Sequence, residues 1–149
     1  MTGKLFIVAT PIGNLNDITF RAVDTLKNVD IVLAEDTRHS KKLFTHFEIS
    51  TPIRAFHEHN EREKTKAIID EIHSGKSIAL ISDAGTPLIS DPGYYLVAYA
   101  KKEGIDVTPI PGPSALIQLC LLQGWQVTVL LFLAFYLARK QQEWNSFKS

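Results

Sequence analysis

The chain has 149 residues, of which 45% are hydrophobic and 21% are charged, and its formal net charge at pH 7 is zero. A chain of this length can bury a hydrophobic core without disulfides or metals, and its single cysteine, Cys120, excludes an intrachain disulfide. The balanced charge gives no sign of the basic surplus that is common in proteins that bind nucleic acid on their own.

Strand-like and helix-like patterns alternate along the chain. Short stretches rich in apolar residues predict five strands, at Leu5–Ala9, Ile31–Ala34, Ile53–Phe56, Ser77–Ile81 and Asp106–Ile110, of which the first two are predicted to be buried. Apolar residues at helical spacing predict the intervening helices, over Ile18–Val29 and Thr37–Phe47, after Asn60 to about His73, after Asp91 to Gly104, and from near Ser114. This alternation predicts an α/β fold, with a mostly parallel sheet and helices on both of its faces.

Polar residues at three of the helix starts are predicted to cap them. Asp17 directly precedes the first helix. Asn60 and Glu63 have the spacing of a capping box. Asp91 stands before Pro92, in the order typical of an N-cap followed by the first helical residue.

The loops that follow the strands are the first place to look for a ligand site, because ligands of parallel sheets bind beyond the carboxyl ends of the strands. Four such loops are rich in residues that allow close approach, namely Thr10–Leu15, Glu35–Arg38, Ser82–Gly93 and Pro111–Ala115. Tight turns need glycine and proline for their own geometry. Four of these loops at one edge of a sheet nevertheless favour a ligand site.

Three glycines, Gly13, Gly85 and Gly112, could bring the backbone directly against a ligand, because they lack a Cβ atom. Backbone N–H and C=O groups exposed in this way can recognise a flat adenine and a ribose. Neither a Walker A pattern nor G-x-G-x-x-G occurs in the chain. The usual signatures of nucleoside triphosphate and dinucleotide sites are therefore absent.

The short run of His57, Glu58 and His59 has the residue types of a metal site. On an extended segment the two histidines would share one side and Glu58 would lie on the other, and no third ligand is evident. We predict a polar or RNA-facing loop here and no metal. Four basic residues could contact phosphate, although a solvated helix face is the simpler explanation for each: Lys41, Lys42, Arg62 and Lys64.

Two features bear on the location of the protein. Met1–Lys4 leads directly into a strand-like stretch and has no pattern of a secretory signal. The longest apolar run, Val127–Leu137, is well short of the ~20 residues that a membrane-spanning helix needs. We therefore expect a cytoplasmic protein with no membrane partner.

The loop sequences themselves resemble a known family. TPIGNL, EDTR, HEHNEREK, SDAGTP and PGPSA occur in this order within about Lys4–Ile117. This combination closely resembles the ribosomal RNA small subunit methyltransferase I (RsmI) family of the tetrapyrrole methylase superfamily. The resemblance implies a homodimeric enzyme that transfers a methyl group from S-adenosylmethionine to the ribose 2′-oxygen of a cytidine in the decoding region of small-subunit rRNA, within the 30S subunit. It also implies two α/β domains with the cofactor in the cleft between them.

Site residues follow from the same motifs. The resemblance implies that the cofactor pocket is lined by Pro11, Gly13, Asp83, Ala84, Gly85, Thr86, Pro111, Gly112, Pro113, Ser114 and Ala115. The attacking hydroxyl must also lose a proton, and a general base would accelerate that step. The candidate bases are the carboxylates of Glu35, Asp36 and Asp83, although each could instead only orient a loop.

After Ile117 the resemblance lapses, because residues 118–132 lack the Asp-Arg-Phe segment of the family. Back-translation in a frame shifted by one nucleotide restores that pattern with allowed codons. We hypothesise a pair of compensating frameshifts, with true divergence as the alternative, and the DNA across codons 115–135 distinguishes them.

We expect a cofactor-binding α/β domain over residues 1–117, and over 118–149 a divergent linker into a second domain. The function expected from the resemblance is rRNA methylation, impaired because most of the second domain is missing. Two alternatives stay open: a non-catalytic module that binds S-adenosylmethionine or the ribosome, and a fragment of a tetrapyrrole C-methyltransferase.

Overall fold

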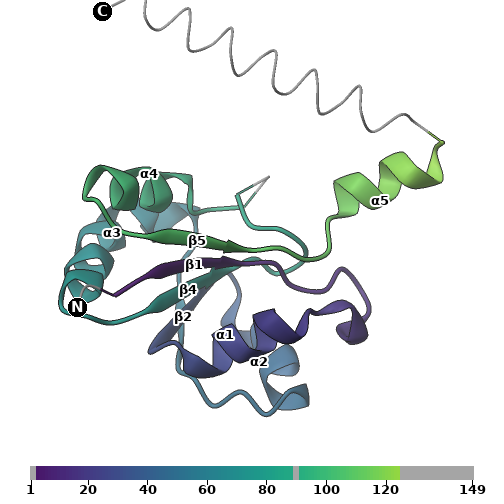
Figure 1. The fold of residues 1–149 in the computed structure, drawn as a ribbon, viewed down its shortest axis with the longest axis horizontal. Helices are drawn as coiled ribbons and strands as arrows, with labels where there is room; N and C mark the ends of the chain where they lie inside the picture. Colours follow the sequence, from purple (N-terminus) through teal and green to yellow (C-terminus); the bar gives the residue numbers. More distant parts are fainter. Residues whose placement is uncertain (1–2, 89–90, 125–149) are drawn as a thin grey trace, which may run out of the picture. The chain divides into compact units, whose positions relative to one another are not determined.

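The computed structural model describes residues 3–88 and 91–124. Its strands are β1 (Leu5–Val8), β2 (Ile31–Ala34), β3 (Ile53–Ala55), β4 (Ile78–Ile81) and β5 (Val107–Ile110). Its helices are the 3-10 helix η1 (Leu15–Asp17) and the α-helices α1 (Phe20–Asn28), α2 (Thr37–His46), α3 (Glu58–His73), α4 (Tyr94–Lys102) and α5 (Ala115–Leu122). The strands form one parallel sheet in the order β3-β2-β4-β1-β5 (Figure 1), which confirms the predicted α/β fold.

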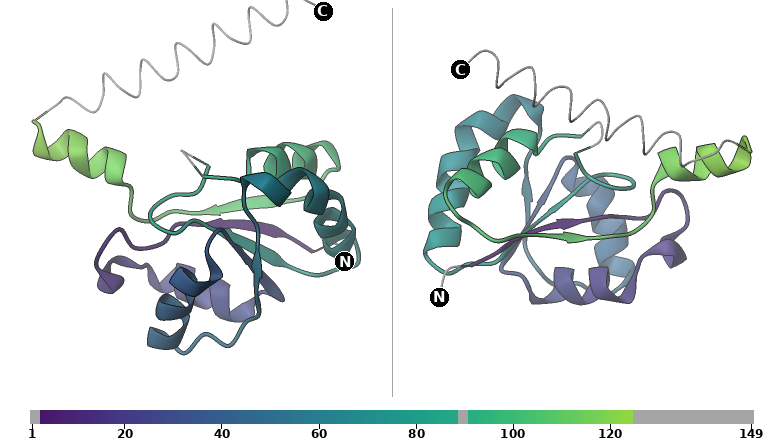
Figure 2. Two further views of the ribbon diagram at one scale, coloured as in Figure 1. Left: turned by 180° about the vertical axis from the view of Figure 1, so that it is seen from behind. Right: turned by 45° about the horizontal axis from the view of Figure 1, so that its top comes forward.

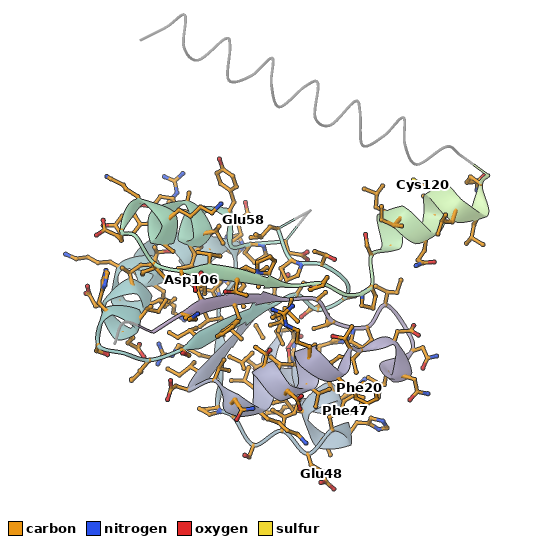
Figure 3. The ribbon with its side chains drawn as sticks, viewed as in Figure 1. Phe20, Phe47, Glu48, Glu58, Asp106 and Cys120 are labelled. Carbon is orange, nitrogen blue, oxygen red and sulfur yellow. The ribbon has the colours of Figure 1, made fainter. Side chains whose placement is uncertain are left out.

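Helices cover both faces of this sheet (Figure 2). Side chains alternate between the faces along each strand, so that in β1 Leu5 and Ile7 join one hydrophobic cluster and Val8 joins the other. The first cluster contains residues of α3 and α4, and the second contains residues of α1 and α2. In Figure 3, Glu58 lies on the α3 and α4 side, whereas Phe20 and Phe47 lie on the α1 and α2 side. Burial on both faces explains why β1, β2 and β4 are apolar throughout, whereas the edge strands β3 and β5 include Arg54 and Thr108 and are less buried.

The two central strands send the chain to opposite faces of the sheet. β1 and β4 are parallel neighbours, with Val8 opposite Ile81 at their carboxyl ends. The chain continues from β1 to α1 on one face and from β4 to α4 on the other. Such a reversal between neighbouring strands is the place at which α/β sheets bind ligands. The fold thus points to the loops after Val8 and Ile81.

Two helices begin elsewhere than predicted. Asp17 lies in η1, and Thr19 caps α1 instead, with its Oγ1 accepting a hydrogen bond from Ala22 N at 3.1 Å. α3 begins earlier than expected, with His57 at its N-cap and Asn60 Oδ1 accepting a hydrogen bond from His57 N at 3.0 Å. Asn60 is therefore the third residue of α3 and not its cap. In both cases another polar residue nearby, Thr19 or His57, occupies the N-cap position. The local sequence alone does not show which of the polar residues caps the helix.

The start of α4 was also predicted wrongly, because its cap comes from another helix. Gly93, not Asp91, occupies the N-cap position, with φ at +124°. Glu61 of α3 supplies the missing acceptor: its Oε1 accepts hydrogen bonds from Gly93 N and Leu96 N, both at 3.1 Å. This carboxylate joins α3 to α4 and stabilises the start of α4.

The chain divides into two compact units, Met1–Ser114 and Ala115–Ser149. The first unit holds the sheet and α1 to α4, and α5 is the helix described in the second. The predicted boundary after residue 117 falls within α5. The apolar run Val127–Leu137 and most of the predicted divergent segment lie outside the described residues. Within the described part of the chain, no helix combines the length and the apolar character needed to cross a membrane.

Candidate functional site

The loops after β1 and β4 are joined by the backbones of Thr10 and Gly85. Thr10 N donates to Gly85 O over 2.9 Å, and Gly85 N donates to Thr10 O over 3.0 Å. Ser82 lies within the same arrangement, since its Oγ donates to Gly85 O and its carbonyl accepts from Thr10 Oγ1, both at 3.0 Å. Thr10 and Ser82 are almost fully buried. These hydrogen bonds hold the two loops in one relative position.

The turn after β5 packs closely against the same pair of loops. Thr86 Oγ1 donates to Pro113 O at 3.1 Å. A Cβ atom on Gly112 would lie 2.9 Å from Cβ of Ala9, which is closer than such atoms approach in proteins. Glycine is therefore required at this position by the approach of one loop to another, independently of any ligand.

Gly85 and Gly13 differ in what their backbones can offer to a ligand. Gly85 has a φ of +84°, and its N–H and C=O groups are both engaged with Thr10. Gly13 has a φ of +127° and is exposed, and a Cβ atom there would meet nothing within 4 Å. Of the two, Gly13 has the space that a direct backbone contact with a ligand needs.

A cavity of about 230 Å³ opens between the β1 loop, the end of β4 and α2. Its apolar lining comes from Pro11, Leu15, Leu43 and Ile81, and its polar lining includes Asn14, His39, Lys42 and Asp83. Pockets for small ligands usually start at about 300 Å³. The cavity is therefore large enough for part of a ligand of cofactor size.

Three carboxylates in the loops after β2 and β4 interact through their charges, and one of them, Asp83, lines the cavity. Partial burial, followed by the negative charges of Asp83 and Asp91, raises the pKa of Glu35 above its ordinary value. Burial, followed by the charge of Asp83, raises the pKa of Asp91. Asp83 joins the loop after β4 to the loop after β2, because its Oδ1 accepts a hydrogen bond from Asp36 N at 3.1 Å. A cation placed beside these groups would relieve their mutual repulsion.

Asp36 has a structural task at the start of α2. Its Oδ1 accepts a hydrogen bond from Arg38 N at 2.8 Å, which caps the helix, and the Arg38 guanidinium donates to both carboxylate oxygens, at 3.2 and 3.0 Å. These bonds to Arg38 lower the pKa of Asp36 to about 2. A carboxylate with this pKa is a weak base at neutral pH.

The predicted cofactor residues fall into two groups. Pro11, Gly13 and Asp83 line the cavity. The remaining positions do not line it, and lie in the loops that follow β4 and β5: Ala84, Gly85, Thr86, Pro111, Gly112, Pro113 and Ser114. Ala115 begins α5 and belongs to the second unit.

Two residues of α2 at the cavity, His39 and Lys42, were missed as candidates from the sequence. The sequence allows a phosphate contact for Lys42 but favours a solvated helix face for it, and it gives His39 no role. The available signal was helical spacing, because His39 is four residues before the buried Leu43 and three before Lys42. Residues at these spacings share one face of a helix, and that face borders the site.

The run of His57, Glu58 and His59, predicted to be a polar or RNA-facing loop, instead forms the N-cap and first residues of α3. His57 is half-buried, and Asn60 Nδ2 lies 2.8 Å from its Nε2. Glu61 caps α4, and Lys64 Nζ donates to Ala55 O at 2.9 Å. Among residues 3–88 and 91–124, no three histidine, cysteine or acidic side chains are grouped so that they could hold a metal ion.

Known proteins resemble this chain in sequence. The family model described as Tetrapyrrole (Corrin/Porphyrin) Methylases matches residues 4–148. Ribosomal RNA small subunit methyltransferase I of Halalkalibacterium halodurans is 51% identical over 140 residues, which are 94% of this chain and 48% of that protein. The protein of the same name from Pseudomonas aeruginosa is 60% identical over 115 residues, which are 77% of this chain and 41% of that protein. The chain thus spans less than half the length of these relatives.

Solved structures share the fold. Diphthine synthase matches with a TM-score of 0.67 at 18% identity, over 83% of this chain and 50% of that one. Uroporphyrin-III-C-methyltransferase from Thermus thermophilus matches with a TM-score of 0.60 at 20% identity, over 76% of this chain and 48% of that one. These identities support the fold alone, whereas the family model and the sequence relatives confirm the predicted resemblance. The chain belongs to the tetrapyrrole (corrin/porphyrin) methylase family, in which ribosomal RNA small subunit methyltransferase I proteins are among its relatives.

Proposed function

We propose that this chain supplies the cofactor-binding half of an enzyme that methylates the ribose 2′-oxygen of a cytidine in the decoding region of small-subunit rRNA. The observation that carries this proposal is the 51% and 60% identity to two proteins named ribosomal RNA small subunit methyltransferase I. In the proposal, residues 1–117 bind the cofactor, and residues 118–149 form a divergent linker into a second domain. The substrate is the rRNA of the 30S subunit, and the working enzyme is a cytoplasmic homodimer.

Methylases of this family take their methyl group from S-adenosylmethionine. When bound, this cofactor supplies a methyl group on a positively charged sulfur. The residues present suit such a group, because the carboxylates of Glu35, Asp83 and Asp91 repel one another and would favour a nearby cation. We assign the cofactor contacts to Pro11, Gly13, Asp83, Ala84, Gly85, Thr86 and the turn Pro111–Ala115.

The three candidate bases differ in how well they could accept the proton of the ribose hydroxyl. Asp36 is hydrogen-bonded to Arg38 and has a pKa of about 2. Partial burial and the charges of Asp83 and Asp91 raise the pKa of Glu35, which brings its basicity closer to the working pH. We therefore favour Glu35, with Asp83 as the second candidate, and assign Asp36 to holding the start of α2.

A second candidate function is a non-catalytic module that binds the cofactor or the ribosome. The cavity of about 230 Å³ favours it, because a pocket smaller than those that usually enclose a ligand excludes water from the reactants poorly. A tetrapyrrole C-methyltransferase has less support, because the matching structure with that kind of name shares only 20% identity. Sequence relatives at 51% and 60% identity carry names that refer to rRNA.

Calorimetric titration of the chain with S-adenosylmethionine tests the cofactor half of the proposal. We expect binding of one cofactor per chain, weakened in Asp83→Asn, because asparagine can keep the hydrogen bond from Asp36 N but removes the negative charge. Asp106→Asn is the matched control, since Asp106 forms an exposed ion pair with Lys4. No heat of binding from folded protein would contradict the proposal, and equal weakening in both variants would contradict the role given to Asp83.

A further inference from the structure

The helix that forms one wall of the cavity is basic. Between Thr37 and His46, α2 carries Arg38, His39, Lys41, Lys42 and His46 and no acidic residue. Arg38 is paired with Asp36, whereas the ion pairs found among the described residues include neither Lys41 nor Lys42. Lys42 is exposed at the cavity and makes no ion pair with a described residue, although the Asp83 carboxylate lines the same cavity. The zero net charge of the whole chain gives no indication of this local positive charge.

The lining of the cavity divides into an apolar part and a part with hydrogen-bond donors. Pro11, Leu15 and Leu43 offer apolar surface, while the side chains of His39 and Lys42 carry N–H groups. A single-stranded nucleotide has matching parts: a flat base that packs on apolar side chains, and a phosphate that accepts hydrogen bonds from cationic ones. The cavity of about 230 Å³ is below the size usual for a whole cofactor.

The charges that line the cavity differ between its two sides. On the α2 side the Lys42 ammonium would attract a phosphate and repel the positive sulfur of S-adenosylmethionine, whereas the Asp83 carboxylate after β4 would do the reverse. Asp83 lies at the border of the cavity and also belongs to the loop assigned to the cofactor. A nucleotide held here would thus have its ribose on the side of the carboxylates, where the methyl group would be transferred.

From these observations, and building on the proposed function, we infer that the cavity between the β1 loop, the end of β4 and α2 binds one unstacked nucleotide of the RNA substrate. The base packs on Leu15 and Leu43, and Lys42 with His39 contacts the adjoining phosphate. Lys42 and His39 are therefore substrate-binding residues of α2, and they take no part in binding the cofactor.

Fluorescence anisotropy of the full 149-residue chain with a labelled single-stranded oligocytidylate tests this inference, at several salt concentrations. Lys42→Ala should weaken binding roughly tenfold, the effect of losing one charge-assisted hydrogen bond. It should also reduce the slope of log affinity against log salt by about 0.7, the value for one phosphate contact in a single strand. His39→Ala should also weaken binding, because it removes a hydrogen-bond donor from the cavity.

Lys41→Ala is the matched control, because Lys41 neighbours Lys42 on the same exposed helix but lines a different hollow, with Thr37 and Phe44. We expect it to change the affinity for oligocytidylate much less. Equal losses for Lys41→Ala and Lys42→Ala would overturn the inference in favour of a diffuse basic surface. Inorganic polyphosphate tests the base contact, because it carries phosphates but no bases. If polyphosphate bound as tightly as oligocytidylate, the inference that the cavity holds a base would be overturned.

Titration of the same variants with S-adenosylmethionine separates this inference from the proposed function. Unchanged cofactor affinity in Lys42→Ala supports the inference, and a loss there would overturn it by assigning the cavity to the cofactor. A chain that binds S-adenosylmethionine but shows no Lys42-dependent RNA binding contradicts the inference alone. A chain that binds RNA through Lys42 but no cofactor contradicts the proposed function alone.

Discussion

Thr10 and Gly85 exchange two backbone hydrogen bonds, 2.9 and 3.0 Å long, between the loops that follow the neighbouring strands β1 and β4. The buried Ser82 reinforces this link by donating from its hydroxyl to Gly85 O. The two loops most closely associated with the proposed cofactor site are thus fixed to each other before any ligand binds. Such preorganisation lowers the entropy that binding must overcome.

The substitution Gly85→Ala tests the importance of this link. An alanine at a φ of +84° is strained, and its Cβ would lie 3.3 Å from Ile12 Cγ2. We expect the free energy of unfolding to fall by about 1–2 kcal/mol, the cost of a left-handed backbone for a residue with a Cβ. We also expect weaker binding of S-adenosylmethionine, measured by calorimetry.

Gly104→Ala is the control for this prediction, because Gly104 has a φ of +72° but no atom within 4 Å of the added Cβ. It should destabilise the protein to a similar extent and leave cofactor binding intact. Loss of binding in both variants would mean that stability, and not the geometry of the Thr10 loop, determines the affinity.

Removal of the Glu61 carboxylate should destabilise the protein through the start of α4. In Glu61→Ala the N–H groups of Gly93 and Leu96 lose their shared acceptor. We expect a loss of about 1–3 kcal/mol in the free energy of unfolding, measured by urea denaturation, because partly buried donors are left without a partner. Glu63→Ala, at an exposed position of the same helix, should change stability little. Similar effects of both substitutions would contradict the capping role.

Neutralising Glu35 should stabilise the protein at neutral pH. Its raised pKa means that ionisation is less favourable in the folded chain than in the unfolded one. The resulting destabilisation develops as the pH rises from the ordinary value of 4.5 through the folded pKa, and it is absent below 4.5. The thermal unfolding midpoint of Glu35→Gln should therefore exceed that of the unsubstituted chain at neutral pH and match it in acid. A lower midpoint at neutral pH would show that the carboxylate makes a favourable contact instead.

The 149 residues alone should transfer methyl groups poorly. The chain spans 48% and 41% of two relatives named as methyltransferases, and its cavity measures about 230 Å³. An incomplete pocket leaves the reaction open to water and positions the reactants loosely. Incubation of 30S subunits with the purified chain and radiolabelled S-adenosylmethionine should give no label above background. Sustained turnover in this assay would show that the 149 residues form a complete site.

Most of the fold could be predicted from the sequence. Apolar runs such as Ile31–Ala34 have no other stable place than a strand that is buried on both faces, and the structure places a strand over these same residues. Glycine and proline then marked the loops at the carboxyl edge of the sheet. Hydrogen bonds between residues far apart in the sequence could not be predicted from local patterns. Glu61, for example, caps a helix that begins more than thirty residues later.

The candidate site was predicted less completely than the fold. The family resemblance pointed to Pro11, Gly13 and Asp83, which line the cavity. The sequence could not reveal that the polar backbone groups of Gly85 are engaged with Thr10, because that pairing depends on tertiary structure. For the same reason it could not distinguish Asp36, which is hydrogen-bonded to Arg38, from the other two carboxylate candidates.

The most direct test of the central claim is a chimera in which residues 3–117 replace the matching segment of the Pseudomonas aeruginosa relative, which is 60% identical over 115 residues. The product is assayed on 30S subunits, and ribose methylation is mapped by resistance of the rRNA to alkaline cleavage. We predict a 2′-O-methyl group on one cytidine of the decoding region. A chimera that folds and binds S-adenosylmethionine but leaves that ribose unmethylated would contradict the account.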